Sequence, residues 1–168
     1  MKKLVCLFFI FITVISNAGC SKKSSDVTAV TAGLSFTAEI SFGDVELECL
    51  AETDKDCNAE FTILAPEEIK ELCFSFRNGD IYSIYKGLEH KFSAEPPQTN
   101  AISSLYKILR NASENKASVI KKDNNYILKG SADDCNYTMY LGATGLPIKI
   151  SCDNGLCVII KNATITQY

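Results

Sequence analysis

Several residue types and motifs on which enzymes depend are scarce or missing in this chain of 168 residues. It has no tryptophan and one histidine, His90, so a serine–histidine–acid triad would have to use that residue. No Gly-x-Ser-x-Gly stretch accompanies it, and we find no glycine-rich phosphate loop or calcium loop. The paired acids at 67–68 and 133–134 are sequence neighbours, which point apart in a strand. We therefore expect a protein that is not an enzyme.

The chain also lacks a basic stripe and a Cys-x-x-Cys motif. Its formal net charge is −3, from 17 lysines and arginines against 20 aspartates and glutamates. A nucleic-acid-binding surface needs clustered positive charge, and structural zinc sites use closely spaced cysteine and histidine ligands. We expect no nucleic-acid partner, no bound metal and no cofactor.

No apolar run reaches the roughly 20 residues that a membrane-spanning helix needs, but a shorter one lies at the N-terminus. Lys2 and Lys3 precede an apolar segment at 4–15, and small residues follow it. A positive start, a short apolar core and a small-residue end are typical of a secretory signal peptide. Removal of this leader would take the net charge from −3 to −5, because Lys2 and Lys3 leave with it.

The leader ends in Ala18-Gly19-Cys20, which resembles the lipobox of bacterial lipoproteins. The resemblance implies cleavage before Cys20 and acyl chains on its sulfur, which would anchor the chain on a bilayer. We expect a signal peptide at 1–19, a lipidated N-terminus with a flexible tether at 20–33, and one folded domain at 34–168. The expected location is the extracytoplasmic face of the cell membrane, in a periplasm or on a Gram-positive surface.

The rest of the chain reads mainly as strands. Apolar and polar residues alternate through 34–64, which predicts a three-stranded antiparallel meander with one apolar face. Asn78-Gly79-Asp80 predicts the turn of a following hairpin. Further strands are expected at 88–92, 118–121, 126–130, 135–141, 147–152 and 157–161.

One amphipathic helix is expected at 99–112. Ile102, Leu105, Leu109 and Ala112 recur there at helical spacing. Many strands, one helix and then more strands predict a mainly-β domain: a single curved antiparallel sheet with the helix against its concave face.

Two stretches carry a resemblance to a known family. "FTILAPEEIKELCFSFRNGDIYSIYKGLEH" and "YTMYLGATGLPIKISCDNGLCVIIKNATI" resemble strands and hairpins of LolA-type lipoprotein carriers. More closely, the chain resembles LolA-like lipoproteins of Gram-positive gut bacteria, over residues 34–165. The resemblance implies a half-open β-barrel of about eleven antiparallel strands with a helix closing its mouth. It also implies a concave cavity that holds acyl chains or other apolar ligands.

Six cysteines lie in the expected domain, an even number that permits three disulfides in an exported protein. A two-residue turn at Asn154-Gly155 would place Cys152 opposite Cys157. Their Cα atoms would then lie about 4.5 Å apart, within bridging distance.

The other four cysteines allow two more pairs. The hairpin near residue 53 would bring Cys49 opposite Cys57, which leaves Cys73 and Cys135 as a third pair. Six reduced thiols that pack as small apolar residues are the alternative.

The apolar face of the expected sheet leaves two hypotheses open. An unfilled face would line a cavity, and the membrane-anchored chain would bind a lipid or another hydrophobic ligand there. A filled face would be a dry core, and the domain would be an envelope protein-interaction or sensor module without a ligand. The candidate ligand-binding residues are Phe36, Ile40, Phe42, Leu47, Phe61, Phe74, Leu105 and Leu109.

Overall fold

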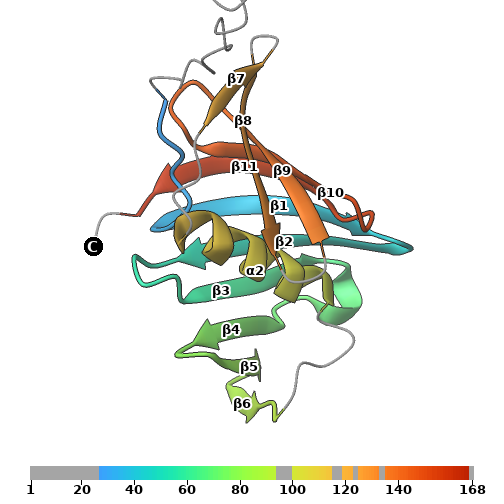
Figure 1. Ribbon diagram of the computed structural model, residues 1–168. Coiled ribbons are helices and arrows are strands. Elements are labelled where there is room, and N and C mark those ends of the chain that lie inside the picture. Colours follow the sequence, from blue (N-terminus) through green and yellow to red (C-terminus); the bar gives the residue numbers. More distant parts are fainter. Residues whose placement is uncertain (1–26, 94–99, 115–118, 123–124, 133–134, 167–168) are drawn as a thin grey trace, which may run out of the picture.

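The computed structural model describes residues 27–93, 100–114, 119–122, 125–132 and 135–166. In this part of the chain, eleven strands form one antiparallel sheet that curves around helix α2 (Asn100–Glu114) (Figure 1). The predicted mainly-β fold with one helix on the concave face is thereby confirmed. The expected leader, Cys20 and the tether up to residue 26 lie outside the described residues.

The strands follow the predicted order closely. They are β1 (Leu34–Phe42), β2 (Val45–Thr53), β3 (Ala59–Ala65), β4 (Cys73–Arg77), β5 (Asp80–Tyr85), β6 (Leu88–Lys91), β7 (Ile120–Lys122), β8 (Asn125–Ala132), β9 (Cys135–Leu141), β10 (Pro147–Cys152) and β11 (Cys157–Ile165). A short 3₁₀ helix, η1 (Glu67–Ile69), joins β3 to β4. Across the sheet the order is β6-β5-β4-β3-β2-β1-β11-β10-β9-β8-β7.

The first and last strands meet in the middle of the sheet. β1 pairs with β2 on one side and with β11 on the other. Its inward residues, Leu34, Phe36, Ala38 and Ile40, are all buried, and Glu39 between them is exposed. Period-two burial of this kind is what the alternating sequence predicts.

Helix α2 fills the concave face. Ile102, Leu105, Ile108, Leu109 and Ala112 are all buried in the core beneath it. Their spacing is that of one helical face, so the predicted amphipathic helix and its apolar stripe are confirmed.

The two Asn-Gly turns differ. Arg77 pairs with Asp80, and both Asn78 and Gly79 have positive φ, so this hairpin has a two-residue turn and the third residue of the predicted turn, Asp80, begins β5. At the other site Cys157 pairs with Ser151 rather than with Cys152.

The prediction of a two-residue turn at Asn154-Gly155 is therefore wrong. The Cys152 N–H donates to the Leu156 carbonyl at 2.9 Å, which leaves three residues in the loop. Gly155 closes it at φ 91°, a left-handed conformation that favours glycine. This one-residue shift in register moves Cys152 and Cys157 to opposite faces of the sheet.

The residues before β1 pack on the domain. The Val30 N–H donates to the Gly145 carbonyl at 3.0 Å, and the Gly33 N–H donates to the Asp54 carbonyl at 3.1 Å. Thr31 is buried. Residues 27–33, which the sequence assigns to the tether, are thus held against the turn between β9 and β10.

Candidate functional site

The eight candidate ligand-binding residues lie in or beside a filled core. Six of them are between 0 and 8 % exposed and belong to one packed cluster: Phe36, Ile40, Phe61, Phe74, Leu105 and Leu109. Phe42 and Leu47 are partly buried at its margin. The helix therefore fills the space that an empty inner face would have left.

A cleft lies beside this core. It has a volume of about 350 Å³ and opens between α2, the turn of the β4–β5 hairpin and the end of β8. Its lining combines apolar and charged side chains and includes none of the eight candidates: Phe76, Gly79, Asp80, Ile81, Tyr106, Lys107, Arg110, Asn111, Glu114 and Ala132.

Aromatic contacts form the inner wall of the cleft. The rings of Tyr106 and Phe76 stack with centroids 4.3 Å apart and planes 18° apart. Phe76 also meets the edge of Phe61 at 5.7 Å. The wall is thus continuous with the core, which makes it rigid at this point.

A hydrogen bond from β9 also holds helix α2 in place. The Tyr137 hydroxyl on β9 donates to Asn111 Oδ1 on α2 at 2.9 Å. Burial, and then the thiols of Cys135 and Cys152, raise the pKa of Tyr137 to about 12. The phenol therefore stays protonated at neutral pH and keeps its proton for this bond.

The rim of the cleft is charged. Arg110 Nε donates to Glu114 Oε1 at 2.7 Å, and this bond is the main cause that raises the pKa of Arg110. Tyr106, Lys107 and Asn111 line the same cleft, because each lies three or four positions from Arg110 or from another lining residue of the helix. The cleft therefore offers an apolar floor beneath a polar edge.

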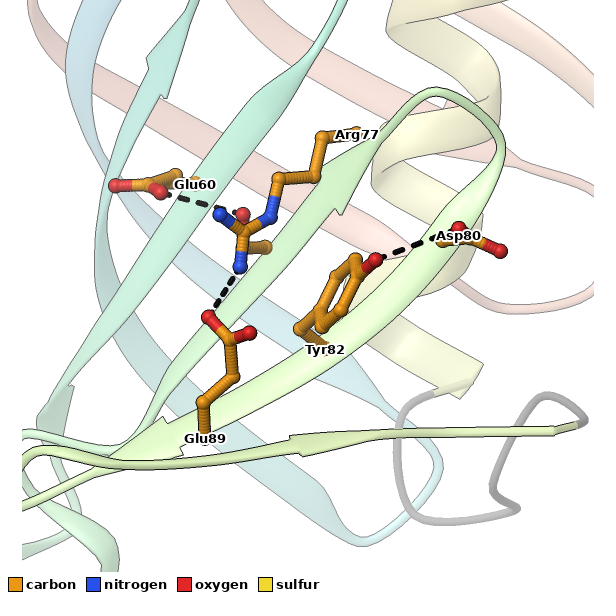
Figure 2. Close-up of polar contacts among 6 residues, drawn as sticks. Glu60, Arg77, Asp80, Tyr82 and Glu89 are labelled. Atoms are coloured by element: carbon orange, nitrogen blue, oxygen red, sulfur yellow. Dashed lines mark hydrogen bonds and ion pairs between the residues drawn. The ribbon is translucent and has the colours of Figure 1, made fainter.

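The strands that form the floor are held together from their outer face, as Figure 2 shows. Arg77 forms an ion pair with Glu89 and lies over the ring of Tyr82, 4.2 Å from its centroid. Ser75 Oγ donates to Glu60 Oε1 at 3.2 Å. These contacts cross β3, β4, β5 and β6.

A further ion pair joins β5 and β6, the two strands at this end of the sheet. Lys91 Nζ donates to Asp80 Oδ2 at 2.6 Å. The Tyr82 hydroxyl donates to the same oxygen at 3.3 Å (Figure 2). The bond from Lys91 is the main cause that lowers the pKa of Asp80. Both groups are exposed, so the pair positions the hairpin more than it stabilises the fold.

All six cysteines of the described domain are free thiols. Cys49 lies opposite Ile63, whereas Cys57 lies in the following loop at φ 60°, so the hairpin does not bring these two together. Burial raises the pKa of Cys49 to about 12.

The other two predicted pairings are not formed either. Five strands separate Cys73 on β4 from Cys135 on β9. The register of the β10–β11 hairpin puts Cys152 and Cys157 on opposite faces.

The remaining candidate groups give no second site. His90 is exposed on β6, with its ring 5.0 Å from that of Phe92. In the described ranges, no three His, Cys, Asp or Glu side chains are arranged to hold a metal ion. Within the same ranges, α2 is too short and too polar to span a bilayer, and no other helix meets that requirement.

Comparison with known proteins gives a likeness at the level of the fold. No family model matches the chain, and no curated protein does. Among solved structures, it is similar to a LolA superfamily protein from Nitrosomonas europaea, with a TM-score of 0.46 and 8 % sequence identity. The alignment covers 87 % of this chain and 91 % of that one.

Proposed function

We propose that this protein is a membrane-anchored, non-catalytic lipoprotein that binds a hydrophobic or amphiphilic ligand in the cleft beside α2. The cleft carries the proposal. Its volume of about 350 Å³ lies at the lower end of the range of small-ligand sites. The proposed ligand site is therefore next to the core rather than among the residues that fill it.

The lining suggests what kind of molecule would bind. Ile81 and Tyr106 are half-buried and offer apolar surface, whose burial contributes about 25 cal/mol per Å², whereas Phe76 and Ala132 are already buried. Arg110 and Glu114 on the rim offer polar groups to a headgroup that stays near water. An acyl chain with a polar end matches both parts of the cleft.

The proposed location rests on the N-terminal sequence. A leader that ends in Ala18-Gly19-Cys20 would place acyl chains on Cys20 and hold the domain on the outer face of the membrane. A ligand that partitions into membranes would be abundant there.

A second candidate function rests on the exposed edge of the sheet. Leu88 on β6 is 78 % exposed and Tyr85 on β5 is 40 % exposed. Because β6 is the last strand of the sheet in the described part of the chain, its outer backbone groups have no neighbouring strand there. An envelope protein partner could add a strand at this edge, which is the interaction-module hypothesis.

A fluorescent fatty acid would test the first proposal with the chain from Ser21 onward, made without its anchor. Ile81 faces the cleft, and Ile84 is on the opposite face of the same strand, where it pairs with Cys73. Ile81→Arg should weaken binding at least about tenfold. This factor corresponds to a loss of about 1.4 kcal/mol of binding free energy. Ile84→Arg is the matched control and should leave the affinity within about twofold.

Native mass spectrometry of protein purified from its own host supplies an independent readout. A ligand that leaves on denaturation, and that is absent from Ile81→Arg, would support the proposal. Bare protein that also fails to bind the fatty acid would reject it and favour the interaction module.

A further inference from the structure

Three cysteines gather where β9, β10 and β11 approach the turn between the last two strands. Cys152 pairs with Tyr137 across β9 and β10. Cys135 is two residues from Tyr137 on the same strand, so both side chains point to the inner face. Cys157 pairs instead with Ser151, the residue before Cys152, so the side chains of Cys157 and Cys152 point to opposite faces of the sheet.

The backbone keeps Cys135 and Cys152 close. The hydrogen bonds between β9 and β10 continue beyond their last paired residues, because the Asp153 N–H donates to the Asn136 carbonyl at 3.1 Å. Asp153 also accepts a hydrogen bond from the Asn136 side-chain amide at 2.7 Å. Cys135 and Cys152 are therefore diagonal neighbours on one face of an antiparallel pair, and their side chains point into the same space.

The two side chains are also near enough for the Cys135 thiol to affect the pKa of Cys152. Burial, then the charge and the hydrogen bond of the Cys135 thiol, raise the pKa of Cys152 to about 12. Cys135 is buried and Cys152 is half-buried, so small oxidants can reach one member of the pair. Cys157 also raises the pKa of Cys152, but only through its charge and as the last of the causes, and it lies on the opposite face with its strand partner Ser41.

We propose that Cys135 and Cys152 form a reversible disulfide that ties β9 to β10 when the protein meets a disulfide oxidant. With oxidised glutathione, the Cys152 thiolate attacks one glutathione sulfur, the glutathione S–S bond breaks, and reduced glutathione leaves with a proton. The Cys135 thiolate then attacks the Cys152 sulfur of the mixed disulfide, and a second reduced glutathione leaves. Two protein thiols are oxidised, one glutathione disulfide is reduced, and both protons end on the released thiols.

The bond would enclose the turn between β9 and β10, which receives the chain before β1. Gly145 in that turn accepts the hydrogen bond from Val30, at the opposite end of the two strands from the cysteines. Because the thiolate is the attacking species, the rate of oxidation should rise with pH across the neutral range.

Oxidation of the full chain in mild detergent, followed by digestion without reductant, tests the proposal. Trypsin leaves Cys135 in peptide 130–149 and both Cys152 and Cys157 in peptide 150–161. We expect these two peptides to be joined, with the loss of two hydrogen atoms. A second cleavage before Asp153 separates Cys152 from Cys157 and identifies the bonded residue.

Variants at the same positions complete the design. Cys157→Ser should retain the joined peptides, whereas Cys152→Ser and Cys152→Ala should both abolish them. Oxidation of the denatured chain provides the control, since it should scramble the pairing. Free thiols at both positions, glutathione left on Cys152, or a bond to Cys157 in the folded protein would each overturn the proposal.

Discussion

The centre of the sheet and its β5–β6 end are stabilised by different means. In β1, the inward side chains Leu34, Phe36, Ala38 and Ile40 are at most 1 % exposed. In the outer hairpin, residues 80–91, no side chain is fully buried, and exposed ion pairs join the strands. We call residues 80–91 the wing.

This difference bears directly on the cleft. Phe76 and Tyr106 belong to the rigid side, whereas Ile81 and Asp80 belong to the wing. Segments with few buried contacts open at low free-energy cost. A cleft with one tightly packed wall and one loosely packed wall would adjust to ligands of different length, which agrees with the proposed function.

The largest expected effect separates the core from the wing. Phe61 is fully buried, and Phe61→Ala should lower the free energy of unfolding by about 3–5 kcal/mol, because it leaves a cavity. Leu88→Ala, in the wing, should change it by less than about 0.5 kcal/mol. Urea denaturation measures both, and similar losses would show that the wing is as well packed as the core.

The next effect concerns the attachment of residues 27–33. Gly145 has φ 83°, and a Cβ added there would lie 2.0 Å from the Thr28 carbonyl oxygen. Gly145→Ala should therefore cost about 1–3 kcal/mol and release residues 27–33, which hydrogen exchange would detect.

Gly142 provides the control in the same turn. An added Cβ would meet its nearest neighbours at 3.7 Å, an ordinary contact distance. Gly142→Ala should leave both hydrogen exchange and stability nearly unchanged. Equal effects at the two glycines would argue against a specific contact with Thr28.

A smaller effect should appear in acid. Hydrogen bonds from Asn136 are the main cause that lowers the pKa of Asp153 below its ordinary value. The stability that this carboxylate contributes is present above its unfolded pKa of about 3.9 and is lost as the pH falls through the lower folded value. Asp153→Asn should therefore flatten the pH dependence of the urea midpoint between about pH 5 and pH 2. An unchanged slope would contradict this assignment.

The smallest effect is expected for the ion pairs of the wing. Lys91→Met removes the partner of Asp80, but both side chains are about half exposed and screened by water. Its effect on the urea midpoint should be close to experimental error and should vanish in high salt. A loss as large as that of Gly145→Ala would show that the wing depends on charge.

The two Asn-Gly turns show where prediction from local sequence succeeds and fails. At Asn78-Gly79 the dipeptide forms the whole loop. At Asn154-Gly155 the Asn154 side chain instead accepts the Leu156 N–H at 3.1 Å, and Asp153 is bonded to β9. A contact with a neighbouring strand thus decides the loop length, and the dipeptide alone does not reveal that neighbour.

The cleft was not predicted from the sequence, for a related reason. Its wall residues come from β4, β5, α2 and β8, and only their arrangement in space creates the hollow. One signal was available in the sequence. Lys107, Arg110, Asn111 and Glu114 flank the apolar stripe of the helix on one side, which marks an edge open to water.

The sequence by itself determined the local features of this protein. The alternation of apolar and polar residues determined where the strands form, and the helical spacing of Ile102, Leu105 and Leu109 determined the helix. The order of these elements along the chain determined the mainly-β class. These signals are local, since each depends on residues a few positions apart.

Only the tertiary structure decided that β1 lies beside β11, that the helix fills the inner face, and that Cys152 lies against Cys135. Those outcomes depend on register and on side-chain volumes contributed by distant segments. A shift of one residue exchanges the two faces of a strand, so a thiol's neighbour follows from the whole sheet rather than from its spacing along the chain.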